Sequence, residues 1–230
     1  SFAADVFIMR KNNEDIFYGN YVVGFIDILG QKEDFKILNG IELISDNEEN
    51  KKIIIELHKK TTGFVTTFRK AFKNYFNVSM KEGPPSVAIP EDKKELFLSM
   101  RKTRLKFKYF SDCMQVYIPL KTEPHHSVAI NGVHALMMAC GHMLLLSLSC
   151  QKAFRAGIDI GIGTEIGNDE IYGPALFSAY ELESKVAQYP RIVVGKKLIN
   201  YLKNLSNRIA SGPNQINEDI EWSKRIADAC

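Results

Sequence analysis

Residues 21–31 read Tyr21-Val-Val-Gly-Phe-Ile-Asp-Ile-Leu-Gly-Gln31, an apolar run with one acid inside it. β-Branched and aromatic residues crowd its first half, which predicts a buried strand followed by a tight turn. A carboxylate in such a strand is costly to bury unless a positive charge compensates it. A metal ion would be the strongest compensation for Asp27. Backbone N–H groups of the turn that follows offer a site for a phosphate.

A second acid, Asp112, has a similar setting in the run Lys108-Tyr-Phe-Ser-Asp112. Residues 103–120 predict a β-hairpin with Ser-Asp at its tip. Strand alternation places Lys106 and Lys108 on the sheet face that also carries Asp112. Two interpretations of this face stay open: a solvated strand face, or the face of an active site. Two acids at strand ends beside a phosphate-sized turn favour two-metal chemistry on a nucleotide.

The composition indicates one α/β domain with a sizeable core. The 230 residues are 45% hydrophobic and carry a net charge of +3. That charge suits an anionic substrate but does not indicate a protein that binds a nucleic-acid duplex. The four cysteines, at positions 113, 140, 150 and 230, have no C-x-x-C spacing. We therefore expect reduced thiols and a cytoplasmic location, and we find no signal peptide before the first strand.

The order of expected elements is β-α-β-β-α-β-α-β, which fits a single α/β sandwich over residues 1–230. Its helices would lie on one sheet face and leave the acid-bearing face open. The other expected elements, in chain order, are a polar arm over 1–20, a long helix after Asn50, a loop over 81–92, a short helix over 94–100, a helix over 128–150, a strand over 154–163, a helix opening at 170–174, a strand over 188–195 and a helix from Lys196. The apolar 128–150 segment carries a polar stripe, so we expect a core helix there rather than a membrane span.

Several short motifs in this order resemble a known enzyme family. They are Phe25-Ile-Asp-Ile-Leu-Gly30, Phe110-Ser-Asp-Cys113, Arg155-Ala-Gly-Ile-Asp-Ile-Gly161, Ile171-Tyr-Gly-Pro-Ala-Leu176, Ala179-Tyr-Glu-Leu-Glu-Ser184 and Ala187-Gln-Tyr-Pro-Arg-Ile192. The set resembles the class III nucleotidyl cyclases, with a core of about 21–202. The resemblance is closer still to the pyrimidine cyclases of the bacterial Pycsar anti-phage system. It implies a ferredoxin-like βαββαβ core.

The resemblance implies a bacterial enzyme that converts UTP to 3′,5′-cyclic UMP and pyrophosphate, as a second messenger in anti-phage defence. The alternative substrate is CTP, which would give cyclic CMP. Two divalent ions per site, Mn²⁺ or Mg²⁺, would be held by Asp27, Ile28 and Asp112. One ion would lower the pKa of the ribose 3′-hydroxyl, and the other would neutralise the triphosphate. The effector would respond to the product, and no nucleic acid or membrane partner is expected.

The resemblance also assigns the rest of the site. In a homodimer with sites at the interface, the acids would come from one protomer and the base-reading groups from the other. The base-reading positions fall at Lys106 and Glu170. The β- and γ-phosphates are expected at backbone N–H groups of the turn, which comprises Ile28, Leu29, Gly30 and Gln31.

Two positions depart from the family pattern. Phe177 and Glu181 stand where class III cyclases carry an Asn and an Arg on the helix after the Tyr-Gly turn. Either catalysis is lost, leaving a nucleotide-binding regulatory domain, or the positive charge comes from elsewhere. The candidates are Arg155, Arg191, Lys106 and Lys108, and a structural role stays open for both arginines. A polymerase-like palm domain is a further alternative, but it requires a more basic surface.

Overall fold

The computed structural model describes residues 7–11, 14–39, 41, 47–82, 105–120, 130–167, 170–207, 224, 227, 228 and 230. The expected helix over 94–100 lies outside these residues. Lys81 and Glu82 belong to a helix, so the loop expected over 81–92 does not include them, and its remainder is also outside.

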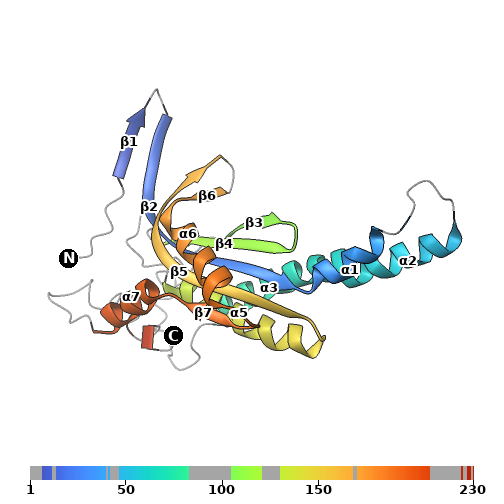
Figure 1. Ribbon diagram of the computed structural model, residues 1–230. Helices are drawn as coiled ribbons and strands as arrows, with labels where there is room; N and C mark the ends of the chain where they lie inside the picture. The colour runs from blue at the N-terminus through green and yellow to red at the C-terminus, as the bar shows by residue number, and fades with distance from the viewer. Residues whose placement is uncertain are drawn as a thin grey trace.

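A seven-stranded sheet forms the centre of the described structure, in the order β3-β4-β2-β5-β6 with β1 beside β2 and β7 beside β5 (Figure 1). The strands are β1 Phe7–Lys11, β2 Glu14–Leu29, β3 Lys106–Phe110, β4 Cys113–Pro119, β5 Ala153–Ile166, β6 Glu170–Tyr172 and β7 Ile192–Val194. All of these pairs are antiparallel except β5–β7, which is parallel. The expected α/β class, with an antiparallel sheet and helices, is confirmed.

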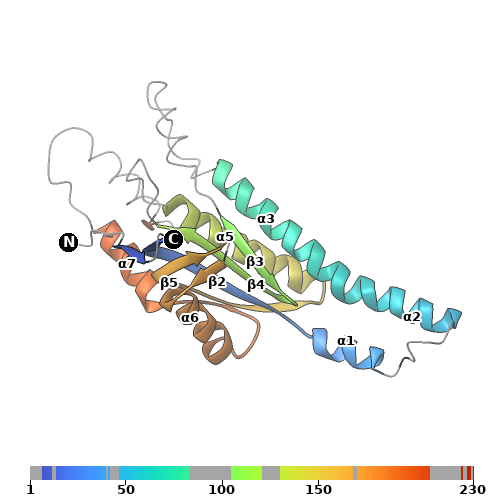
Figure 2. The same cartoon turned by 90° about the horizontal axis from the view of Figure 1, so that it is seen from above.

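The helical elements are α1 Gln31–Leu38, α2 Glu48–His58, η1 Lys59–Gly63, α3 Phe64–Glu82, α5 Ile130–Ser149, α6 Pro174–Glu181, η3 Leu182–Val186 and α7 Lys196–Ser206. The elements α2, η1 and α3 continue one another, and α3 lies alongside α5 (Figure 2). At the start of α2, Asn47 caps the helix, because its side chain accepts a hydrogen bond from the Glu49 N–H at 2.9 Å. The long helix expected after Asn50 is thereby confirmed.

The main core lies between one face of the sheet and α3 and α5. Alternation along β2 turns Val22 and Ile26 toward this core, where they join Phe68, Phe72 and Leu136. Burying a side chain such as Phe72 contributes roughly 1.5–3 kcal/mol to stability. Within the described residues, α5 is the single helix long and apolar enough to cross a membrane, and the same test is passed by core helices. Its membership of the main core confirms the core-helix prediction.

The opposite face of the sheet is not left open, which corrects the prediction that all helices share one face. Tyr21, Val23 and Tyr117 form a second cluster there with Ala175 and Ala179 of α6. Close approach makes this possible, because β5 has glycine at the contact. A Cβ built on Gly157 would lie 2.2 Å from the backbone oxygen of Ala179.

Two further predictions are corrected at strand ends. The polar arm expected over 1–20 is instead a hairpin in its described part, because β2 begins at Glu14 and pairs with β1. The segment from Glu170, expected to open a helix, first adds the short strand β6 to the sheet edge. The helix then begins at Pro174, the first-turn position that suits proline.

Candidate active site

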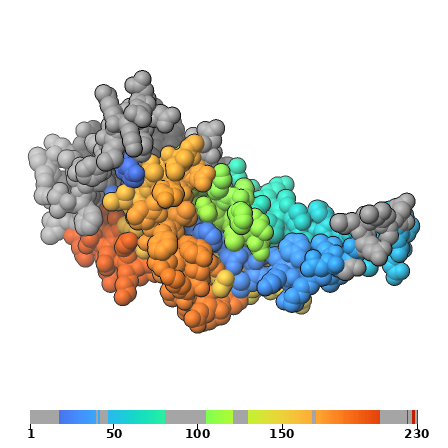
Figure 3. Space-filling view, turned by 45° about the horizontal axis from the view of Figure 1, so that its top comes forward, coloured from blue at the N-terminus to red at the C-terminus, as the bar shows by residue number. Residues whose placement is uncertain are grey.

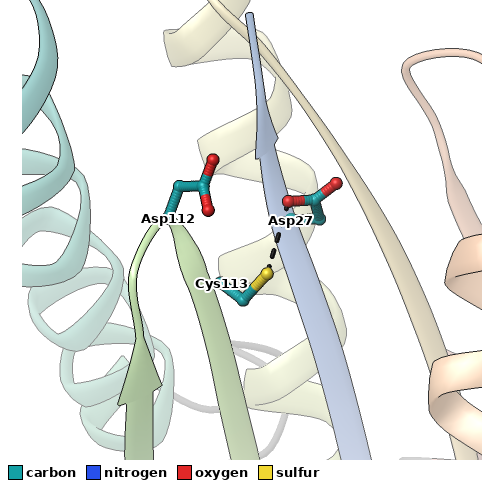
Figure 4. Close-up of side chains that lie close together, drawn as sticks. All are labelled: Asp27, Asp112 and Cys113. Carbon is teal, nitrogen blue, oxygen red and sulfur yellow. Dashed lines mark hydrogen bonds between the residues drawn. The ribbon is translucent and has the colours of Figure 1, made fainter. Parts of the chain in front are cut away.

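The two acids among the predicted metal ligands, Asp27 and Asp112, meet at one end of the sheet. Asp27 lies near the end of β2 and stands opposite Cys113 of β4 in the antiparallel register. Asp112 lies in the two-residue turn before β4, where Ser111 takes a left-handed φ of 51°. Ligand atoms of Asp27, Asp112 and Cys113 all lie within 4.8 Å of one another (Figure 4). Acids separated by 85 positions in the chain are thus brought together by strand pairing.

This donor set fits a divalent cation. Carboxylate oxygens are the ligands that Mg²⁺ and Mn²⁺ prefer, and two of them converge here. The Asp27 side chain is 20% exposed, so it is sheltered yet reachable from solvent. When bound, such ions supply Lewis-acid activation of a hydroxyl and neutralisation of phosphate charge.

Cys113 is a member of this cluster that the sequence did not single out. Its thiol donates a hydrogen bond to Asp27 Oδ1 at 3.4 Å. Burial raises the pKa of the Cys113 thiol to about 12, and the neighbouring Asp27 charge adds to the effect. The thiol is therefore protonated at neutral pH. Its position directly after Asp112 was the available signal, but nothing in the local pattern distinguishes a structural cysteine from a ligand.

Arg155 supplies the positive charge next to Asp27. It stands opposite Asp27 in the β2–β5 register, and its Nη2 donates to Asp27 Oδ2 at 2.9 Å. The same Nη2 lies 2.8 Å from Glu183 Oε1. Burial alone would lower the pKa of the Arg155 guanidinium, but hydrogen bonding to Asp27 and the Glu183 charge together raise it. Of the candidate cations, Arg155 is therefore the one that contacts a predicted metal ligand.

Glu183 is a further residue near Asp27 that the sequence pattern did not single out. Its side chain is 3% exposed and lies in η3, a π-helical turn that follows α6 directly. Burial raises the pKa of the Glu183 carboxyl, Arg155 opposes this, and the nearby Asp27 carboxyl raises it further. Regular helical spacing along 174–187 would place Val186 on the apolar face. The π turn alters that spacing, so Val186 is 43% exposed and Glu183 is buried instead.

The predicted phosphate turn has the required backbone form. Gly30 has φ 87°, a left-handed conformation that suits glycine, and it caps the N-terminus of α1. The first N–H groups of a helix lack intrahelical partners and attract anions. The Ile28 N–H is already engaged, since it donates to the Asp112 carbonyl oxygen at 3.3 Å. Gln31 is buried, and both polar atoms of its side chain lack a hydrogen-bond partner among the described residues.

The predicted base-reading residues occupy the acid-bearing face but pair with other partners. Lys106 donates to Glu165, and Lys108 lies 3.6 Å from Glu170. Figure 3 shows the corresponding surfaces side by side, the β3–β4 hairpin in green next to β5, β6 and α6 in orange. Lys106 stands opposite Tyr117, four residues along β4 from Cys113, so it is displaced from Asp27 by roughly 13 Å along the strand direction alone. Glu165 was not predicted, because its contact joins residues 59 positions apart.

The remaining predicted positions lie in local contacts. Arg191 donates to the Tyr189 hydroxyl at 3.0 Å and to the Val186 carbonyl, and its guanidinium stacks over the Tyr189 ring. Glu181 forms an exposed ion pair with Lys185 in the next helical turn. Phe177 is 59% exposed on α6. A catalytic role for Arg191 therefore stays a prediction.

Comparison with known proteins gives structural likenesses only. No protein-family model and no curated protein match the sequence. One of the matching solved structures is the adenylyl cyclase CyaB from P. aeruginosa, with 17% identity over 83% of this chain and 84% of that chain and a TM-score of 0.44. Another is a bacterial light-regulated adenylyl cyclase, with 10% identity over 91% of this chain and 98% of that chain and a TM-score of 0.47. A third is the guanylyl cyclase domain of the RhoGC fusion protein from the aquatic fungus Blastocladiella emersonii, with 12% identity over 81% of this chain and 86% of that chain and a TM-score of 0.41. Because these sequence identities and TM-scores are low, the likenesses do not establish the chemistry of this chain.

Proposed function

We propose that this protein is a metal-dependent nucleotidyl cyclase that acts on a pyrimidine nucleoside triphosphate, with UTP as the preferred substrate. The observation that carries the proposal is the convergence of Asp27 and Asp112, with Cys113, within 4.8 Å at the ends of paired strands. The sequence motifs had predicted that these two acids share one site. Their meeting supports two-metal chemistry on a phosphate rather than a solvated strand face.

Different residues of the chain have different roles in an intramolecular phosphoryl transfer. Asp27 and Asp112 would hold and orient the divalent cations at the end of β2. The N-terminus of α1, at Gly30 and Gln31, receives the β- and γ-phosphates. The ribose 3′-hydroxyl loses its proton to solvent, its oxygen attacks the α-phosphorus in line, the bond from the α-phosphorus to the bridging oxygen of the β-phosphate breaks, and pyrophosphate leaves. Positioning and charge stabilisation supply most of the rate enhancement in such reactions.

A homodimer completes the site in this proposal. The base-reading positions Lys106 and Glu170 share a face with Asp27 but lie away from it along the sheet. A second copy facing this surface would bring its own pair toward the acids of the first. Mixing an Asp27→Asn protein with a Glu170→Gln protein should then restore part of the activity in heterodimers. If both inactive variants stay inactive after verified subunit exchange, each site is built within one protomer.

The choice of base rests on hydrogen bonding and on the family resemblance. Uracil offers N3–H to Glu170 and a carbonyl oxygen to Lys106, whereas cytosine offers its amino group to the acid. Guanine can also satisfy a carboxylate, so this pair alone does not exclude a purine. The exposed ring of Phe177, which replaces a small polar residue of the family, is available to crowd a larger base. The Pycsar resemblance favours UTP over CTP.

The test is incubation of the protein with each of the four nucleoside triphosphates and Mn²⁺, with products resolved by mass. We expect cyclic UMP as the main product, cyclic CMP second, and little from ATP or GTP. A dominant cyclic AMP or cyclic GMP peak would contradict the base assignment. Nucleotide binding without any cyclic product would favour the regulatory-domain alternative, which the substitutions at positions 177 and 181 keep open.

A further inference from the structure

The contact between Arg155 and Asp27 puts a cation on one carboxylate oxygen of a proposed metal ligand. Arg155 Nη2 donates to Asp27 Oδ2 at 2.9 Å, and both side chains are sheltered, at 24% and 20% exposed. A guanidinium in this place occupies carboxylate lone pairs that a divalent cation needs. A metal ion that binds Asp27 at Oδ2 has to compete with this arginine.

Glu183 lies where it can accept the arginine. Its carboxylate is 3% exposed, and its Oε1 lies 2.8 Å from the same Arg155 nitrogen. Glu183 Oε1 is thus ion-paired with Arg155 but accepts no well-directed hydrogen bond among the described residues, so a better-directed bond from the guanidinium is open to it. A small rotation of the guanidinium would exchange the bond to Asp27 for one to Glu183.

The backbone holds Glu183 in this place. η3 is packed against β5 so closely that a Cβ on Gly157 would lie 2.6 Å from the Glu183 backbone nitrogen. Because η3 is a π-helical turn, Glu183 faces the sheet in place of an apolar residue. Charged side chains are seldom fully buried without a partner, and the partner available here is Arg155.

We propose that Arg155 is a displaceable counter-ion of Asp27, and that Glu183 is the positioning residue that receives it when a divalent cation binds. In the metal-free protein, Arg155 neutralises Asp27 and reduces the repulsion between the Asp27 and Glu183 carboxylates. On metal binding, its guanidinium moves onto Glu183. The inference rests on the proposed function in taking Asp27 as a metal ligand, and it adds a control of metal affinity to that site.

The test is the Mn²⁺ affinity of the purified protein without nucleotide, measured from the electron paramagnetic resonance signal of free Mn²⁺. Arg155→Met removes the competing cation and should tighten binding by about tenfold. Glu183→Gln keeps the shape but removes the receiving charge, so it should weaken binding by about tenfold. In the Arg155→Met background, Glu183→Gln should have a much smaller effect, because Glu183 acts through Arg155.

The neighbouring Glu181–Lys185 ion pair supplies matched controls. Lys185→Met and Glu181→Gln make the same changes of charge in an exposed ion pair, whose two residues lie on the helical segment that also carries Glu183. We expect them to change the Mn²⁺ affinity less than about twofold, because exposed charges are screened. Glu183→Gln is isosteric, so it tests the proposal even if Arg155→Met fails to fold.

Weaker or unchanged Mn²⁺ binding in folded Arg155→Met would overturn the inference, and so would unchanged binding in Glu183→Gln. Undetectable Mn²⁺ binding by the wild type would overturn it as well. Failure of the proposed function has a different signature. If Arg155→Met binds Mn²⁺ more tightly and Glu183→Gln binds it more weakly, but no nucleoside triphosphate is cyclised, the counter-ion exchange is supported and the cyclase assignment is wrong.

Discussion

Asp159 is another acid in the sheet, and the structure gives it a role in stability. It is 5% exposed on β5, and its Oδ1 accepts a hydrogen bond from the Leu198 N–H at 2.9 Å. Leu198 is the third residue of α7, so Asp159 satisfies an N-terminal donor of that helix from a distant strand. Gly195 permits the approach, since a Cβ there would lie 2.1 Å from the Asp159 carboxyl carbon.

Asp159→Ala should therefore destabilise the protein. A hydrogen bond to a charged acceptor contributes about 1.5–3 kcal/mol, and the loss leaves the buried Leu198 N–H unpaired. At about 2 kcal/mol, the Tm of a domain of this size should fall by about 4–8 °C. Asp159→Asn keeps an acceptor oxygen and loses only the charge at the helix N-terminus, about 1 kcal/mol, so its Tm should fall by about 2–4 °C.

Thermal unfolding followed by circular dichroism measures both shifts, with the exposed Glu181→Ala as a control expected within about 0.5 kcal/mol of wild type. Turnover per folded molecule should be unchanged in Asp159→Asn, because Asp159 does not belong to the metal cluster. An Asp159→Ala protein that melts with the wild type would refute the capping argument. An inactive but fully folded Asp159→Asn protein would refute the separation of structural from catalytic acids.

Three further predictions concern glycines and thiols. Gly157→Ala would place a Cβ 2.2 Å from the backbone oxygen of Ala179. It should lower the free energy of unfolding by about 1–3 kcal/mol or more, as measured by denaturant titration. An unchanged free energy of unfolding would mean that α6 packs less closely against β5 than described. Gly30→Ala meets no neighbour within 4 Å, so its cost of about 1–2 kcal/mol should come from the left-handed φ alone, and Gly30→Asn should cost less in the same titration. Because burial raises the pKa of the Cys113 thiol to about 12, iodoacetamide at pH 8 should label the exposed Cys150 first, as peptide mass spectrometry would report; equal labelling would contradict the burial of Cys113.

Local patterns predicted the elements that carry the site. The run of β-branched and aromatic residues before Asp27 predicted the end of β2, and strand patterns on both sides of a polar tip predicted the hairpin around Asp112. The register that sets Asp27 opposite Cys113 is not a local property, because it depends on how strand residues 86 positions apart align. Placing both acids in one site therefore required the family resemblance as well as the pattern.

The second layer of the site could not be predicted from periodicity. Regular helical spacing turns Val186 inward, whereas the π turn of η3 buries Glu183 in its place. Such turns have no clear sequence signal, since they arise when packing against a sheet changes the hydrogen-bonding step. The approach of η3 to Gly157 is the tertiary contact that decides the outcome here.

Long-range ion pairs were equally hidden. Lys106 was assigned to a base and Glu165 was assigned no role, yet the two meet across the acid-bearing face. The early part of β2, from Glu14, reads as a polar arm in the sequence. Its strand character comes from pairing with β1 and β5, which the segment alone does not reveal.

In the proposed enzyme, Asp27 and Asp112 together form the catalytic metal centre. The most direct measurement is cyclic nucleotide formation with Mn²⁺ by wild type, Asp27→Asn and Asp112→Asn, with Asp159→Asn as a matched acid-to-amide control in the same sheet. The two site variants should stay folded, as judged by circular dichroism, and form no cyclic product, while the control keeps wild-type turnover per folded molecule. Near-normal turnover in either folded site variant would contradict the claim.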